Sequence, residues 1–453
     1  MKIRLFLCAM LVLFCGALMA QETEGTKTEG EKTVSEKTET PKAEPPKQEE
    51  AQPKPETPIE EKEGTLFGIL KLNIAWCGIA KFDYYSSDNT VSILQDGAVV
   101  YDKVSVHDTF SMRAAYLYAT GSVGDLKGSL LLNFVNKDSN PVCWWYIEFP
   151  PFSELKEYLK VRAGQFIKPF GRQPQTFPYE LTFARYGQIL GRLFDNGAGF
   201  YDAGVSFLGS KTFELAKIDF NFKYELGIFN GEKMNTSDTT DQKAICGRVE
   251  FASKKITSWV KADMLSFGFS YFNGGPRFMN DAYNTKFTER TYFGADLEFR
   301  CMQKRLSILF EYASGTDDLS YIDSVTHIPM VELNRPTDGW FVELGYFVYV
   351  NKKLASENAP LPELRKRPFG LQIAALLDVL NLASNPKMYV ATGEYQRPMN
   401  IYGLAINYDI RWNLKLQVVF TRLDYGRYYS GLYSGVDDFS KNRITVQLGF
   451  IAF

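Results

Sequence analysis

Histidine is nearly absent from this chain, since only His107 and His327 occur among its 453 residues. Hydrolases with a histidine base and most zinc sites need that residue beside a nucleophile or further ligands. A Gly-x-Ser-x-Gly motif, which carries the nucleophile of many α/β-hydrolases, is also missing. We therefore expect neither a barrel hydrolase nor a secreted β-sandwich enzyme, and assign no catalytic residue.

Cysteine is scarce as well. Beyond the first 20 residues only Cys77, Cys143, Cys246 and Cys301 remain, widely spaced and without a Cys-x-x-Cys pair. Such spacing supports no metal or redox motif, so we expect no metal and no cofactor. The thiols are expected to pack singly among apolar side chains, although one disulfide would suit an oxidising compartment.

Long apolar runs are missing beyond residue 20, which excludes helical membrane spans. Residues 1–20 themselves, with Lys2 and Arg4 before an apolar run that ends near Ala20, have the pattern of a secretory signal peptide. Cys15 offers a lipoprotein alternative, which the bulky neighbour Phe14 disfavours. We expect the chain to leave the cytoplasm.

Residues 21–64 contain no aromatic side chain. Thirteen glutamates against seven lysines give this segment a net charge of −6. It cannot bury enough apolar surface to fold, so we expect a disordered periplasmic spacer, extended by its prolines. A tether to the cell wall or to a periplasmic partner is the alternative. Residues 65–453 then carry only +2, which argues against nucleic-acid binding.

Apolar and polar residues alternate in several segments of residues 65–453. Leu404, Ile406 and Tyr408 alternate with Asn407 and Asp409, for example. A period of two predicts a strand with one apolar face. Without helical spans, a bilayer can be crossed only by a closed β-barrel, because every backbone polar group must be paired. A soluble β-sandwich gives the same alternation, so the pattern alone leaves both open.

Other features favour the barrel. Aromatics make up 15% of the chain and gather near strand ends, and connections alternate between short and long. The expected strands number seventeen, although a barrel with both ends in the periplasm needs an even number. They are 66–77, 109–121, 126–136, 142–149, 159–166, 200–208, 217–229, 244–252, 262–273, 291–301, 304–314, 338–350, 368–380, 387–396, 402–412, 414–424 and 443–453.

One connection stands out by its length and composition. After the strand at 159–166, Pro169, Pro174 and Pro178 end any ladder, and an aromatic-rich stretch runs to about Phe200. A loop of this length in a compact chain is either functional or disordered, and its aromatic residues argue against disorder.

These residues also carry a family resemblance. The string GQFIKPFG at 164–171, the pair Arg185-Tyr186 and the later Arg192 before a glycine-containing strand resemble the phosphate-selective porin O/P family of bacterial outer membranes. The resemblance implies an all-β transmembrane antiparallel barrel of 16 strands, located in the outer membrane, with an infolded loop that narrows the pore. It also implies a homotrimer.

The cations on or beside this loop are the candidate pore-constriction residues. An arginine stays charged and can offer two donors to an oxyanion. The candidates are Arg162, Lys168, Arg172, Arg185 and Arg192. Alternatively, each pairs with a loop acid such as Glu180 or Asp195, or faces external water. Lumen walls also carry mixed charge, and acids such as Glu311 occur on the polar faces.

The sequence thus predicts a diffusion porin that contacts outer-membrane lipid and passes small hydrophilic solutes, with a preference for anions. Phosphate selectivity does not follow. The resemblance implies that phosphate-selective members of the family rely on a dense set of basic residues, whereas residues 65–453 of this chain carry a net charge of only +2. The alternative is a structural or adhesion barrel with a plugged lumen, tethered to the cell wall by its tail.

Overall fold

The computed structural model describes residues 64–66, 70–87, 89–93, 99–103, 106–135, 140–194, 199–215, 218–231, 234–236, 242–256, 262–274, 277–280, 285–322, 329–351, 368–382, 400–411, 413–424 and 440–452. The expected signal peptide and all but the last residue of the expected spacer lie outside these ranges.

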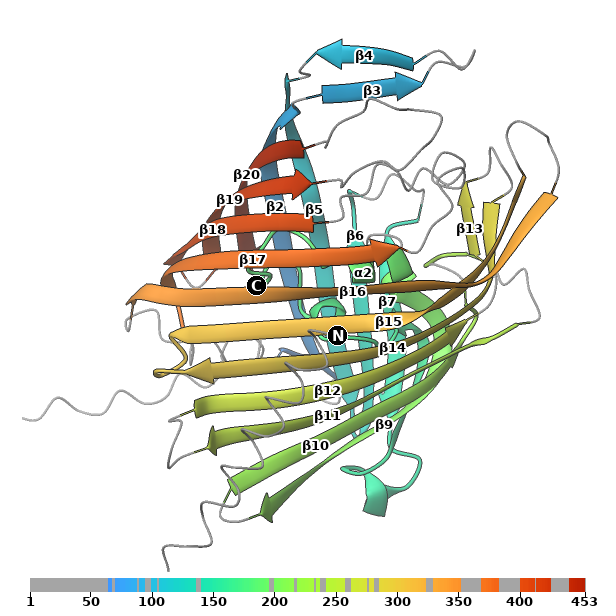
Figure 1. Cartoon of the computed structure of the whole chain (residues 1–453). Helices are drawn as coiled ribbons and strands as arrows, with labels where there is room; N and C mark the ends of the chain where they lie inside the picture. The colour runs from blue at the N-terminus through green and yellow to red at the C-terminus, as the bar shows by residue number, and fades with distance from the viewer. Residues whose placement is uncertain are drawn as a thin grey trace, which may run out of the picture. The chain divides into compact units, whose positions relative to one another are not determined.

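Sixteen strands of the described part form one antiparallel ring. They are β2 (Leu70–Ser87), β5 (Val106–Val123), β6 (Leu126–Asn133), β7 (Val142–Phe149), β8 (Lys160–Ile167), β9 (Tyr201–Leu215), β10 (Ile218–Phe229), β11 (Ala244–Ile256), β12 (Ala262–Gly274), β14 (Thr285–Cys301), β15 (Leu306–Ile322), β16 (Pro329–Val350), β17 (Gly370–Leu382), β18 (Asn400–Arg411), β19 (Leu414–Asp424) and β20 (Ser440–Ala452). Each pairs with the next, and β20 pairs with β2 (Figure 1). The prediction of a closed 16-stranded barrel is confirmed.

Four short strands and three helical segments complete the described elements. β1 (Gly64–Leu66) pairs with β2, β13 (Arg277–Asn280) pairs with β14, and β3 (Asn89–Ile93) pairs with β4 (Val99–Lys103). The helical segments are η2 (Ser153–Leu155), η3 (Gln173–Gln175) and α2 (Gln188–Leu193). No helix of the described residues is both long and apolar enough to span a membrane. The additional strand expected at 387–396 lies outside the described residues.

The barrel turns its apolar side chains outward. In β18 the buried positions include Asn407 and Asp409. The exposed side chains of the same strand are Tyr402, Leu404, Ile406, Tyr408 and Ile410. Because the strand period is two, one face is apolar and exposed and the other faces the interior of the ring. An apolar outer band around a polar interior is the pattern of a transmembrane barrel, so the β-sandwich alternative is wrong.

The two ends of the barrel differ in their connections. At one end, Gly124 and Asp125 join β5 to β6, and residues 302–305 join β14 to β15. At the other end, residues 168–200 join β8 to β9. The first strand, β2, begins at the short-turn end and the last, β20, finishes there. The predicted alternation of short and long connections therefore holds for these three, but residues 351–369, which join β16 to β17 at the short-turn end, depart from it.

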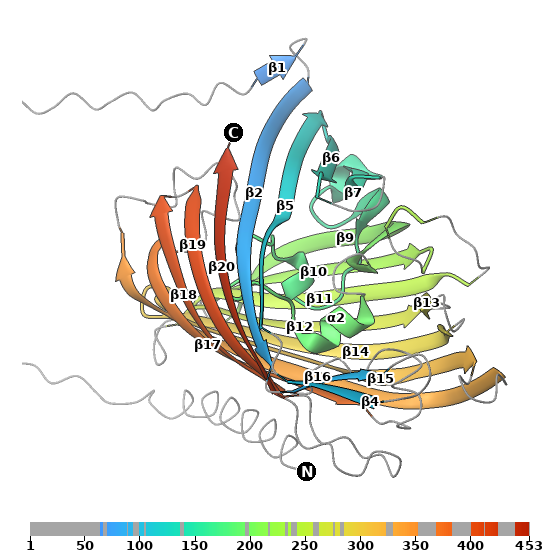
Figure 2. The ribbon, with the colours of Figure 1, turned by 90° about the horizontal axis from the view of Figure 1, so that it is seen from above.

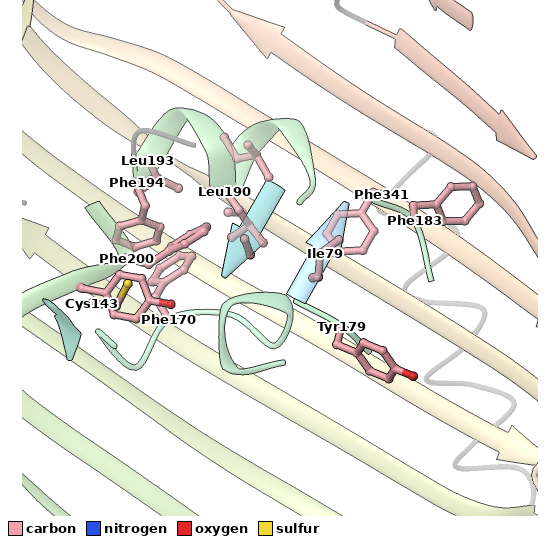
Figure 3. Packing of buried hydrophobic residues seen from close by; sticks show 14 of the residues in the cluster. Ile79, Cys143, Phe170, Tyr179, Phe183, Leu190, Leu193, Phe194, Phe200 and Phe341 are labelled. Atoms are coloured by element: carbon pink, nitrogen blue, oxygen red, sulfur yellow. The ribbon is translucent and has the colours of Figure 1, made fainter. Parts of the chain in front are cut away.

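The interior of the ring holds residues 168–194 and 199–200, the described part of the connection between β8 and β9. Seen from above, α2 lies inside the ring of strands (Figure 2). Buried side chains of this segment and inward-facing wall residues form one apolar cluster. The cluster includes Phe170, Phe194 and Phe200 from the segment with Ile79 and Phe341 from the wall (Figure 3).

Candidate functional site

The interior loop, residues 168–200, leaves the wall and returns to it at nearly the same point. The Lys168 N–H donates to the carbonyl oxygen of Phe200 across 2.8 Å, which closes the base of the loop. Pro169, Pro174 and Pro178 follow, and a proline has no N–H with which to continue a strand ladder. The chain therefore cannot extend β8 and turns into the barrel instead.

Aromatic side chains hold the interior loop to itself and to the wall. Phe194 packs against Phe170 and Phe200, with ring centroids 5.6 and 5.3 Å apart, and against Phe272 of β12 at 5.6 Å. Phe194 is only 2% exposed. Each of these arrangements is tilted or edge-to-face, the geometry that aromatic pairs prefer. The loop is thus packed as a core element.

Carboxylates of the wall accept hydrogen bonds from the backbone of the interior loop. Glu311 of β15 accepts from the N–H groups of Arg172 (2.9 Å) and Gln173 (3.2 Å). Asp378 of β17 accepts from the Gln188 N–H at 3.0 Å, in the first turn of α2. That N–H has no partner within its helix, so the carboxylate satisfies a group that would otherwise be buried unpaired.

Side chains of the C-terminal strands β18 and β19 donate hydrogen bonds to a second part of the interior loop. Lys415 of β19 donates from Nζ to the carbonyl oxygens of Tyr179 (3.3 Å) and Leu181 (3.0 Å). Asn407 of β18 donates from Nδ2 to the carbonyl oxygen of Thr182 (3.2 Å). The interior loop is therefore fixed on strands from β15 to β19, far from its base between β8 and β9.

Two of the predicted constriction residues have paired but partly accessible guanidinium groups. Arg162 of β8 contacts Glu148 and Glu225, each at 2.9 Å, and its side chain is 18% exposed. Arg172 contacts Glu250 at 3.4 Å and also Glu298, and its side chain is 17% exposed. The partners are carboxylates of the wall strands.

The other three candidates lie at different depths. Arg185 contacts Asp378 at 3.1 Å with its side chain 27% exposed. Lys168 contacts Asp202 at 3.0 Å, and both side chains are 2% exposed. Burial lowers the pKa of the Lys168 ammonium below its usual value, and the charge of Asp202 opposes that shift. Arg192 belongs to α2, and its side chain lies outside the described residues.

Ion pairs follow one another along the inner wall near Arg172. Lys223 contacts Glu250 at 3.4 Å, Glu250 contacts Arg172, and Arg172 contacts Glu298, which accepts a hydrogen bond from Arg300 at 2.6 Å. Acids and bases alternate along this row from β10 to β14. The row therefore presents paired charges of both signs instead of a field of one sign.

The wall acids are the part of the site that sequence reasoning missed. Glu250, Glu298 and Asp378 received no role, although each has the strand parity of an inward-facing residue. Their alternation with apolar neighbours was the available signal. This alternation predicts on which face of the strand a side chain lies, but not which residue of the interior loop it contacts. Among the described residues, no cluster of three or more side chains could hold a metal ion.

Taken together, these features define the class of this protein: a transmembrane β-barrel whose polar interior holds an ordered inward loop. No family model matches the sequence, and no curated protein sequence matches it either. The resemblance to the phosphate-selective porin O/P family therefore remains an expectation.

Solved structures offer distant similarities. The outer membrane channel DcaP of Acinetobacter baumannii is 10% identical, with 85% of this chain and 98% of that one covered, at a TM-score of 0.48. OprB of Pseudomonas putida is 9% identical over 84% and 94%, at 0.48. OmpT of Vibrio cholerae, an outer membrane protein in trimer form, is 11% identical over 84% and 99%, at 0.44. At these values the likenesses carry no argument about function.

Proposed function

We propose that this protein is an outer-membrane diffusion channel for small hydrophilic solutes, narrowed by the interior loop. The observation that carries the proposal is the closed ring with a polar inner face, crossed by a loop that wall residues hold in place. A water-filled barrel of this strand number leaves a lumen wide enough for solutes. A loop fixed inside it sets the narrowest cross-section, where selection occurs.

In this proposal Arg162, Arg172 and Arg185 border the passage, Lys168 holds the base of the loop, and the role of Arg192 in the constriction stays a prediction from the sequence. Each of the three arginines keeps part of its surface accessible while it contacts a carboxylate. A guanidinium group has five N–H donors, so contacts to carboxylates leave donors for a passing oxyanion. The paired acids weaken the local positive field, so we expect a modest preference for anions and only weak block by phosphate.

The first test is the reversal potential of the purified full-length protein in a planar bilayer across a potassium chloride gradient. We expect a stable conductance with a reversal potential displaced modestly toward anions. Conductance without that displacement would keep the channel but remove the selective role of the arginines. Titration with phosphate in the same bilayer tests phosphate selectivity, which requires a saturable block.

A structural barrel with a plugged lumen is the second candidate, and the apolar cluster favours it. Phe170, Phe194 and Phe200 join the wall residues Ile79 and Phe341 in that cluster, so part of the lumen is filled. Replacing residues 173–186 with a short Gly-Ser linker separates the two candidates. A channel conducts before the replacement and conducts more after it, whereas a plugged barrel conducts only after it.

We also propose a homotrimer in the outer membrane, with residues 21–64 in the periplasm as a spacer or cell-wall tether. Chemical cross-linking in detergent tests the trimer, and a monomer alone at all protein concentrations would exclude it. Deleting residues 22–64 tests the tail. Loss of envelope integrity with unchanged permeability would favour the tether.

A further inference from the structure

A groove lies at the rim of the barrel, on the short-turn end and away from the interior loop. It has a volume of about 430 Å³ and lies between the β7–β8 connection and β9. Its lining is formed by Lys156, Glu157, Tyr158, Lys160, Ser210, Lys211 and Thr212. Three lysines against one glutamate give the lining a positive charge, and the hydroxyl groups of Tyr158, Ser210 and Thr212 can donate hydrogen bonds.

The β7–β8 connection crosses the outer face of β9. Val205 and Phe207 are exposed on that face, and the strand period places Gly209 and Lys211 on it as well. A Cβ atom at Gly209 would overlap the carbonyl oxygen of Tyr158. The same oxygen accepts a hydrogen bond of 2.7 Å from the hydroxyl of Tyr224, on the neighbouring strand β10. The connection is therefore held against the side of the barrel that faces lipid.

Aromatic side chains lie on the same outer face of β9 and β10, where Phe222 is the strand partner of Lys211. Phe213 stacks on Phe220 with centroids 5.9 Å apart, and Phe222 contacts Phe251 at 5.0 Å. Phe152 on the connection itself is 59% exposed. Belts of aromatic residues in membrane barrels lie at the level of the lipid headgroups. The aromatic residues beside Lys211 therefore favour a position of the groove at the level of the lipid headgroups.

Lys211 is positioned for this environment. Its Nζ lies over the ring of Tyr158 in the β7–β8 connection, 5.3 Å from the ring centroid. Lysines near a membrane boundary extend their apolar stems along the protein and place the ammonium group among headgroups. The strand period turns Lys160, Ser210 and Thr212 to the opposite, inner side, and Lys160 contacts Glu148 at 3.3 Å. On the outer side Lys156 and Lys211 therefore supply the available positive charge.

We propose that this groove binds the phosphate headgroup of a membrane phospholipid from the leaflet at the short-turn end. Lys156 and Lys211 complement a phosphodiester, and the aromatic side chains on the outer face of β9 and β10 are suited to the acyl chains beside it. The site is separate from the interior loop, so it does not depend on whether the barrel conducts.

The test is native mass spectrometry of the full-length protein in detergent, with phosphatidylglycerol and phosphatidylcholine as probes and inorganic phosphate as competitor. We expect one phosphatidylglycerol to be retained more strongly than phosphatidylcholine. The double substitution Lys156→Gln with Lys211→Gln should lower its occupancy about tenfold, because each lysine adds attraction to an anionic surface. The matched control is Lys127→Gln, an exposed lysine at the same end of the barrel in β6.

The charge-preserving pair Lys156→Arg with Lys211→Arg should retain the lipid. An unheated gel, on which a folded barrel migrates differently from the unfolded chain, confirms folding of every variant. Equal retention by the glutamine pair and the wild type would overturn the proposal. Equally, displacement of the lipid by inorganic phosphate at similar concentration would assign the groove to a free anion and reject a lipid site.

Discussion

Lys168 and Asp202 form a salt bridge of 3.0 Å between the first residue of the interior loop and the strand to which the loop returns. Asp202 also accepts a hydrogen bond of 2.9 Å from the Gly231 N–H, beyond the end of β10. Both side chains are almost fully buried. This pair joins β8, β9 and β10 at the point where the loop enters the barrel, so it determines how the loop begins.

Replacing Lys168 should destabilise the barrel. Lys168→Met leaves the Asp202 carboxylate buried without its cation, which costs on the order of 3–5 kcal/mol in folding free energy. Urea unfolding followed by tryptophan fluorescence in detergent measures the change. The double variant Lys168→Met with Asp202→Asn is the control and should recover much of the loss. Equal loss in both variants would mean that the pair contributes through packing alone.

Neutralising Asp378 should make the channel favour anions more strongly. Asp378→Asn removes the negative charge opposite Arg185, whose side chain is 27% exposed. We expect the reversal potential in a potassium chloride gradient to move toward the value for a channel that passes only chloride. Asp338→Asn is the matched control, because Asp338 lies on the same sheet but points outward from β16. An equal displacement in both variants would show that Arg185 does not face the passage.

A side chain at Gly171 should displace the interior loop. Gly171 has a φ of +67°, and a Cβ atom there would overlap the carboxylate of Glu311. Gly171→Ala therefore strains the backbone by about 1–2 kcal/mol and disturbs the contacts of Glu311 with the loop. We expect a noisier and larger conductance. Gly128→Ala, where a Cβ meets nothing within 4 Å, should behave as the wild type.

Removing the central ring of the apolar cluster should loosen the loop without unfolding the ring of strands. Phe194→Ala leaves a cavity among Phe170, Phe200 and Phe272, which costs about 3–5 kcal/mol in a closed core. Proteolysis of intact proteoliposomes should then reach the loop. The outward-facing Phe269, which is 54% exposed, supplies the control Phe269→Ala. Protection of the loop in both variants would contradict its anchoring by Phe194.

The strand pattern was readable because the period of two is a local property. Alternation of apolar and polar residues at 402–410 predicted which side chains share a face, and the structure exposes the apolar face with Leu404 and Ile406. The prolines after β8 predicted where the strand ends and the loop begins. Each of these inferences needs only neighbours in the chain.

The partners of the loop could not be read in this way. Arg172 meets Glu250 and Glu298, and Arg185 meets Asp378, because closing the ring brings β11, β14 and β17 around the loop. An ion pair depends on distances of a few ångströms, which residues far apart in the chain reach only after the barrel has formed. The sequence alone predicted most of the strands, the apolar and polar face of each, and the presence of a loop. Only the tertiary structure decided that the loop's arginines are matched by carboxylates of the wall.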